Sequence, residues 1–177
     1  MKIVCIIPDR KTLLSVVDEE TNITEFRHIF DQWSDVEYLY DFFEQNRSDL
    51  GDITIETAIR RVTDDAANLE EDLLNVAENE FDSLQSLFRP LNPGDYRLSD
   101  FQKSKAYGTI QKSWLRIYAI RINPETYIVT GGAIKLTQTM QERPHTNDQL
   151  TRLNQVRDYL IREGFDENDI EDTEISP

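Results

Sequence analysis

The chain has 177 residues, of which 38% are hydrophobic and 30% charged, and its formal net charge is −15. This composition is typical of one globular domain, and no stretch approaches the roughly 18 consecutive apolar residues of a membrane-spanning helix. The single cysteine, Cys5, excludes an intrachain disulfide and a metal site built from several cysteines. The apolar start at residues 3–7 is too short for a signal peptide, so we expect a cytoplasmic protein that makes no membrane contact.

The N-terminal part of the chain predicts a hairpin followed by two short helices. Residues 2–7 and 12–18 are rich in aliphatic and β-branched side chains and flank a polar turn, a pattern typical of paired strands. Capping-box patterns at 22–25 and 34–37 each predict the start of a helix, and the second helix should end near Asn46.

A long helix is predicted by the clearest periodicity in the chain. Its apolar residues are spaced alternately by four and three positions: Ile55, Ile59, Val62, Ala66, Leu69, Leu73 and Val76. This spacing fits either a helix that packs on its own sheet or a coiled coil that forms a homodimer. We favour packing within the molecule, because three heptads are near the minimum for a coiled coil.

The second half of the chain predicts a sheet and one more helix. After a loop with a short helical turn at 79–92, strands are expected near 97–103, at 113–122 and from 126 to about 136, with a bend or a bulge at the glycine pair 131–132. A helix should span 146–163 and stop at Gly164. We therefore expect a single α+β domain over residues 1–165, with helices packed on a small antiparallel sheet. The acidic segment 166–177 should form a tail.

The charge of the chain reverses between residues 97 and 145. This segment holds eight Lys and Arg residues against three acidic ones, whereas residues 1–96 hold eight basic and 22 acidic residues. The segment is also rich in aromatic and strand-forming side chains. A basic, aromatic island in an acidic protein is a candidate site for phosphate or RNA.

Alternation along the strand at 113–122 selects the central candidates. Trp114, Arg116 and Tyr118 should share one face, because alternate residues of a strand point the same way. Cations hold phosphates, and aromatic rings stack on unpaired bases. RNA cleavage without a metal needs a base for the 2′-hydroxyl proton, a cation that stabilises the phosphorane and an acid for the leaving oxygen. A Tyr or Lys side chain can serve in this reaction where crowded cations lower its pKa. The candidate catalytic residues are Arg116, Tyr118 and Lys135. The candidate RNA-binding residues are Lys103, Lys105, Tyr107, Trp114, Arg121, Gln138, Arg143 and His145.

A simpler interpretation of the island remains open. It is a solvated strand face on which long basic side chains cover apolar neighbours. The two histidines, His28 and His145, lie far apart in sequence, and motifs of metalloproteases, P-loop proteins and α/β-hydrolases are absent. We therefore expect no metal and no cofactor.

Residues 95–160 resemble the RelE/HigB-like toxin superfamily, in particular its phage-derived HigB-like members. The resemblance rests on the strand Trp114-Leu115-Arg116-Ile117-Tyr118, on Gly132, Lys135, Thr137 and Gln138, and on a helix after Pro144 that contains Arg157-Asp158-Tyr159. It implies a RelE/ParE-like core at 95–165, to which the hairpin and helices of 1–94 are added. By position, Arg116 and Lys135 would bind phosphate, and Tyr118 would stack or assist.

The resemblance implies a toxin of a toxin–antitoxin system that cleaves mRNA on the ribosome and is restrained by a cognate antitoxin. The acidity of the chain, together with Ala133 and Leu136 in place of the family's usual Phe and Lys, keeps a second function open. That alternative is a non-catalytic module that binds protein or nucleic acid on a RelE-like fold. In either case the acidic helices or the tail 166–177 could cover the basic island.

Overall fold

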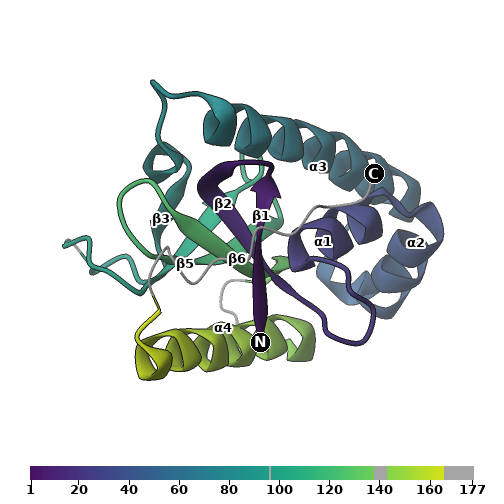
Figure 1. The fold of residues 1–177 in the computed structure, drawn as a ribbon. Coiled ribbons are helices and arrows are strands. Elements are labelled where there is room, and N and C mark those ends of the chain that lie inside the picture. The colour runs from purple at the N-terminus through teal and green to yellow at the C-terminus, as the bar shows by residue number, and fades with distance from the viewer. Residues whose placement is uncertain (96, 138–142, 166–177) are drawn as a thin grey trace.

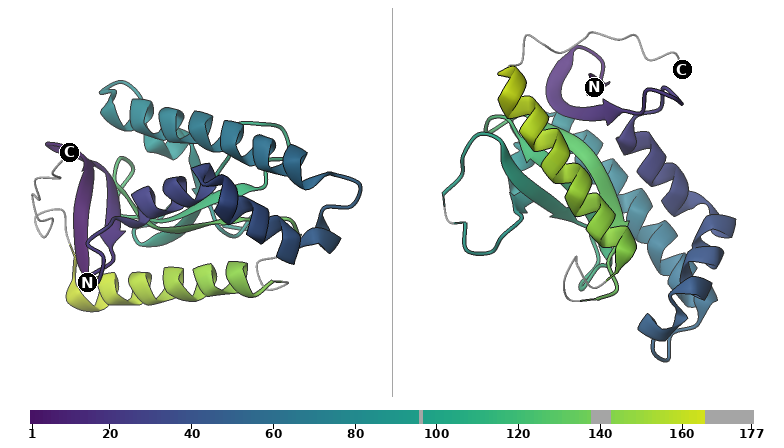
Figure 2. Two further views of the ribbon diagram at one scale, coloured as in Figure 1. Left: turned by 90° about the vertical axis from the view of Figure 1, so that its right-hand side faces the viewer. Right: turned by 90° about the horizontal axis from the view of Figure 1, so that it is seen from below.

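The computed structural model describes residues 1–95, 97–137 and 143–165, which form a sheet between two helical layers. Helices α1 (Glu25–Ser34), α2 (Val36–Gln45) and α3 (Ile55–Glu78) lie on one face, and α4 (Pro144–Glu163) lies on the other (Figure 1, Figure 2). The predicted α+β class is confirmed. The predicted tail at 166–177 lies outside the described residues.

The sheet has six strands in the order β1-β2-β6-β5-β4-β3. Their bounds are β1 Lys2–Ile7, β2 Arg10–Val17, β3 Phe88–Pro90, β4 Gln102–Tyr107, β5 Leu115–Arg121 and β6 Tyr127–Ile134. The predicted hairpin is confirmed as the antiparallel pair β1–β2. The sheet is mixed rather than purely antiparallel, because β2 pairs in parallel with β6. Through this pairing the hairpin belongs to the same sheet as the basic island.

Two strands differ from the sequence predictions. Strand β4 begins at Gln102 rather than near residue 97, and the short β3 forms where a loop was expected. Strand β6 continues through the glycine pair as expected, and the expected irregularity is a bulge directly before it, which leaves Thr130 without a cross-strand partner on β5. A bulge inserts one residue and bends the strand locally.

The helix starts follow local capping chemistry. Thr24 caps α1 and Asp35 caps α2, so each helix begins slightly later than its capping box predicted. Thr54 caps α3, and short 3-10 turns precede and follow that helix at Arg47–Asp49 and Leu84–Ser86. Gly164 ends α4 with φ 63°, a left-handed conformation that glycine adopts without strain.

The apolar stripe of α3 is buried inside the molecule. Val62, Ala66, Leu69 and Leu73 are all at most 2% exposed and belong to a core shared with α1, α2 and the sheet. A second core lies between the opposite face and α4 and includes Leu153, Val156 and Leu160. The interpretation of α3 as a packing helix is therefore confirmed. Among the described residues, no helix is both long and apolar enough to span a membrane.

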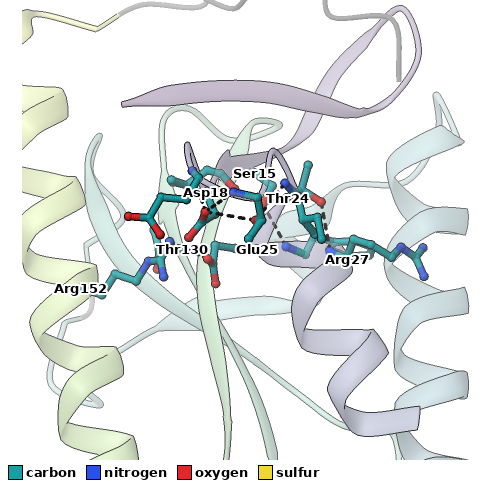
Figure 3. A network of polar contacts seen from close by, with 12 residues as sticks. Ser15, Asp18, Thr24, Glu25, Arg27, Thr130 and Arg152 are labelled. Atoms are coloured by element: carbon teal, nitrogen blue, oxygen red, sulfur yellow. Dashed lines mark hydrogen bonds and ion pairs between the residues drawn. The ribbon is translucent and has the colours of Figure 1, made fainter. Parts of the chain in front are cut away.

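An ion pair between a buried carboxylate and a partly exposed arginine connects the two helical layers beside the last paired residues of β2 and β6 (Figure 3). Glu25, the first residue of α1, lies 2.6 Å from Arg152 of α4 and is 5% exposed. Next to it, the Ser15 hydroxyl accepts a hydrogen bond from the Phe26 amide at 3.1 Å. Burial raises the pKa of Glu25, because the loss of hydration outweighs the attraction of Arg152.

Candidate nucleic-acid interface

Strands β4 and β5 gather basic and aromatic side chains on the sheet face that also carries α4. Their register pairs Lys103 with Ile120, Lys105 with Tyr118 and Tyr107 with Arg116. Cross-strand partners share a face, and Tyr118 and Ile120 pack in the core beneath α4. Helix α4 packs mainly on β6 and β5, so the β4 side of this face stays open. We call its five polar members the basic face: Lys103, Lys105, Tyr107, Arg116 and Tyr118.

Arg116 and Tyr107 form the centre of the basic face. The guanidinium carbon of Arg116 lies 4.0 Å from the centre of the Tyr107 ring, and Nζ of Lys105 lies 5.6 Å from the same centre. Nη1 of Arg116 also donates to the carbonyls of Ser113 and Leu115, both at 2.7 Å. Burial lowers the pKa of Arg116, yet a guanidinium remains charged at neutral pH. Tyr107 as a whole residue is 39% exposed, so part of it is accessible to a ligand.

Tyr118 contributes a buried hydroxyl beside Arg116. The residue is 1% exposed, and its hydroxyl has no hydrogen-bond partner among the described residues. Burial raises the pKa of Tyr118 to about 12, and the nearby Arg116 offsets only part of this effect. The condition under which a tyrosine could serve as a base, a pKa lowered by crowded cations, is therefore not met at Tyr118. The phenol keeps its proton at neutral pH and can donate a hydrogen bond, but it is a poor base.

A carboxylate on the opposite face of the sheet holds the loop between β4 and β5. Asp65 of α3 is 2% exposed and accepts hydrogen bonds from the amide and hydroxyl of Thr109, at 2.6 and 3.0 Å, and from the amide of Ile110 at 3.2 Å. Its other oxygen accepts from the Ser113 hydroxyl at 2.5 Å. Since the Ser113 carbonyl binds Arg116, Asp65 positions the basic face from the far side of the sheet.

The loop approaches Asp65 so closely that residue 108 must be small. A Cβ atom on Gly108 would lie 2.2 Å from both Asp65 Oδ2 and Ser113 Oγ. Glycine removes this clash. The sequence contained no sign of this contact, because Asp65 and Gly108 lie on elements far apart in the chain.

Trp114 lies on the face opposite to the one predicted. Its ring packs against the core beneath α1–α3, 5.9 Å from the Phe43 ring, and the guanidinium carbon of Arg61 lies 4.1 Å above it. Strand β5 begins only at Leu115, so strand alternation does not extend to Trp114. The alternation from Leu115 to Ala119 is as predicted, with Arg116 and Tyr118 on one face.

Lys135 follows the end of β6 near Arg116. Its amide donates to the Trp114 carbonyl at 2.6 Å, which extends the ladder by one bond. Ala133, two residues earlier, is the cross-strand partner of Arg116. The backbone therefore brings Lys135 beside the basic face, as the sequence suggested.

The other predicted residues lie elsewhere. Arg121 is 5% exposed on the opposite face and pairs with Asp100 at 3.3 Å. Arg143 donates from Nε to Asp49 at 2.7 Å. His145 places Nε2 3.1 Å from the Ile134 carbonyl, with its ring against Phe42. The prediction for Gln138 lies outside the described residues.

Sequence reasoning missed one cation on this face, Arg89. It is exposed on β3 and is the cross-strand partner of Lys105. The sequence predicts a loop over residues 88–90, so strand alternation was not applied to them. Within the described ranges, no three His, Cys, Asp or Glu side chains gather as metal ligands.

Comparisons with protein-family models, curated proteins and solved structures gave no match for this chain.

Proposed function

We propose that the basic face binds single-stranded RNA. The observation that carries this proposal is the partly exposed Tyr107 with the Arg116 guanidinium stacked upon its ring at 4.0 Å. A base can stack on such a ring while the cation attracts the adjoining phosphate. Lys103 and Lys105 continue along the same strand face, where further phosphates of an extended strand would lie. The resemblance of residues 95–160 to RelE/HigB-like proteins supports the same ligand class.

The acidity of the chain affects the expected strength and salt dependence of RNA binding. The net charge of −15 opposes the approach of a polyanion, so the attraction must be local and strongly weakened by salt. Each phosphate neutralised on a single strand contributes about −0.7 to the slope of log affinity against log salt. Three cations of the basic face, Lys103, Lys105 and Arg116, therefore predict a slope of about −2.

A salt titration with a labelled single-stranded RNA oligomer, followed by fluorescence anisotropy, tests this proposal. Lys105→Ala should weaken binding and reduce the magnitude of the slope by about 0.7. Arg60→Ala is the matched control, because Arg60 is exposed on α3 across the sheet. Equal losses in the two variants would mean that general charge, not the basic face, governs binding.

A second candidate function is metal-independent cleavage of mRNA on the ribosome, as the resemblance to RelE/HigB-like toxins implies. The specific observation that favours it is the protonated, unpartnered hydroxyl of Tyr118 near Arg116. In this reaction the 2′-oxygen attacks phosphorus, gives its proton to a base such as water, and the bond to the 5′-oxygen breaks. Arg116 would stabilise the phosphorane, and the buried hydroxyl of Tyr118 would have to become accessible to the RNA before it could donate the proton that the leaving oxygen needs.

Controlled expression in a bacterial host tests the cleavage proposal. Wild type should arrest growth and shorten mRNA, and the double variant Arg116→Ala, Lys135→Ala should restore growth. Harmless wild-type expression with intact mRNA would contradict cleavage. RNA binding without cleavage by the purified chain would leave the basic face as a binding module.

A further inference from the structure

A second group of cations surrounds an open cavity at the start of β4. The cavity has a volume of about 600 Å³ and lies between the 94–103 segment and α4. Its lining residues are Gly94, Asp95, Arg97, Ser99, Gln102, Lys103 and Arg157. Among these described residues, three cations face one carboxylate. The volume is in the range of small-molecule sites, which combine a concave shape with a few fixed polar groups.

Two of the three cations are held in place by neighbouring groups. Nε of Arg157 donates to the Phe101 carbonyl at 2.8 Å, which leaves its two terminal nitrogens for other partners, one of them 3.9 Å from Asp158. Lys103 donates to the amide oxygen of Asn154 at 2.9 Å and retains two further hydrogens. A guanidinium and an ammonium fixed at one cavity form a suitable cradle for a phosphate group.

Gln102 also lines the cavity, although its side chain shares the opposite face of the sheet with Arg121. Gln102 is 8% exposed and donates from Nε2 to the Arg97 carbonyl at 3.1 Å, while its Oε1 is buried and unpartnered. Arg121, the cross-strand partner of Gln102, has a buried and unpartnered Nε as well. The unpaired acceptor and the unpaired donor belong to neighbouring residues of one face, and both atoms are buried, so the cations provide the polar groups of the cavity.

From these observations we infer that the cavity binds the phosphate group of a nucleotide, held by Arg97, Lys103 and Arg157. The group can come from a free nucleotide or from the 5′-phosphorylated end of an RNA. The second source rests on the proposed RNA binding by the basic face. Lys103 and Tyr107 are four residues apart on β4, about 13 Å, so an RNA end in the cavity would place a nearby base at Tyr107.

Calorimetric titration of the full chain with adenosine 5′-monophosphate tests the inference, with adenosine as the phosphate-free probe. The monophosphate should bind saturably and adenosine should not compete. Arg97→Ala and Lys103→Met should each weaken binding about tenfold, the loss expected for a charged hydrogen bond, and Arg60→Ala should not. Arg97 is exposed, so its replacement leaves both cores intact. Absence of saturable binding, or equal affinity in wild type and Arg97→Ala, would overturn the inference.

A second arm separates the two sources of the phosphate. RNA oligomers that differ only in a 5′-phosphate or a 5′-hydroxyl are compared in the anisotropy assay. Tighter binding of the phosphorylated oligomer, lost in Arg97→Ala, assigns the cavity to RNA ends. Equal binding of both oligomers, together with monophosphate binding, assigns it to a free nucleotide. The 5′-hydroxyl RNA has no terminal phosphate, so its affinity measures binding to the basic face alone. Loss of its binding would contradict the proposed function, whereas loss of monophosphate binding would contradict only the inference about the cavity.

Discussion

The guanidinium of Arg116 is held between the Tyr107 ring, 4.0 Å from its carbon atom, and the carbonyl of Ser113, 2.7 Å from its Nη1. The position of the cation is therefore set by the loop that joins the two strands. Because Asp65 anchors that loop from α3, the helical layer on one face of the sheet helps to set the position of Arg116 on the other.

Asp65→Asn should destabilise the fold. An amide offers one acceptor oxygen in place of the carboxylate's two, and its NH2 group would face the donors of the loop. We expect a loss of about 2–3 kcal/mol and a Tm lower by ~5–10 °C, measured by thermal and urea unfolding. Asp64→Asn is the matched control, since Asp64 is exposed on the same helix. Equal Tm values for the two variants would contradict the role of Asp65.

Gly108→Ala should also destabilise the chain, because the new Cβ would meet Asp65 and Ser113 at 2.2 Å. Overpacking of this kind costs about 1–3 kcal/mol, which urea unfolding can resolve. Gly94→Ala provides the comparison, since no atom lies within 4 Å of the position that its new methyl group would take. A Gly108→Ala variant as stable as Gly94→Ala would show that the loop is not tightly held.

Tyr118→Phe separates binding from cleavage. Removal of a buried hydroxyl without a partner should leave stability at neutral pH unchanged or slightly higher, and RNA affinity should change little. If Tyr118 donates a proton to the leaving oxygen, cleavage should fall by about 10²-fold or more. An unchanged cleavage rate in the phenylalanine variant would exclude Tyr118 from that role.

The same variant has a pH signature in the alkaline range. The pKa of Tyr118 is about 12 in the folded protein and near 10 in the unfolded chain. The stability that the neutral phenol contributes is therefore fully present below about pH 10. This stability is lost as the pH rises from about 10 through 12, by ~2–3 kcal/mol in total. Unfolding free energies measured across this range should fall less steeply for Tyr118→Phe than for wild type. Parallel curves would contradict the raised pKa.

Glu25→Gln tests the ion pair with Arg152. The pKa of Glu25 is raised by burial, so its proton-linked stability is present below the unfolded pKa and is lost as the pH rises through the folded pKa. Glutamine does not titrate, so the variant does not lose this stability as the pH rises. The free energy of unfolding of the variant minus that of wild type should therefore be larger at neutral pH than at a pH below the unfolded pKa of Glu25. Urea unfolding at an acidic and a neutral pH measures this difference, and the opposite trend would contradict it.

Local patterns in the sequence predicted much of the fold. The heptad spacing located α3 within two residues of its C-terminus, and the β1–β2 hairpin and the end of α4 at Gly164 followed from short-range signals. The parallel pairing of β2 with β6 joins segments more than 100 residues apart and leaves no local pattern. It therefore had to come from the structure.

The candidate site was predicted in part for the same reason. Alternation along a strand correctly placed Arg116 and Tyr118 on one face, but it failed at Trp114, which precedes the first residue of β5. In the sequence, Asp65 cannot be told apart from the other acidic residues of the acidic helix α3. Its role depends on Thr109, which lies 44 positions further along the chain and whose amide comes within 2.6 Å of the carboxylate.

The most direct test of the basic face is the affinity of a single-stranded RNA oligomer for wild type, Tyr107→Phe and Tyr107→Ala, measured by fluorescence anisotropy at low salt. A stacked base is worth about 1–3 kcal/mol, so Tyr107→Ala should weaken binding about tenfold or more. Tyr107→Phe keeps the ring and should bind like wild type. Equal affinity of all three proteins, or no RNA binding by wild type, would contradict RNA recognition by Tyr107 and Arg116.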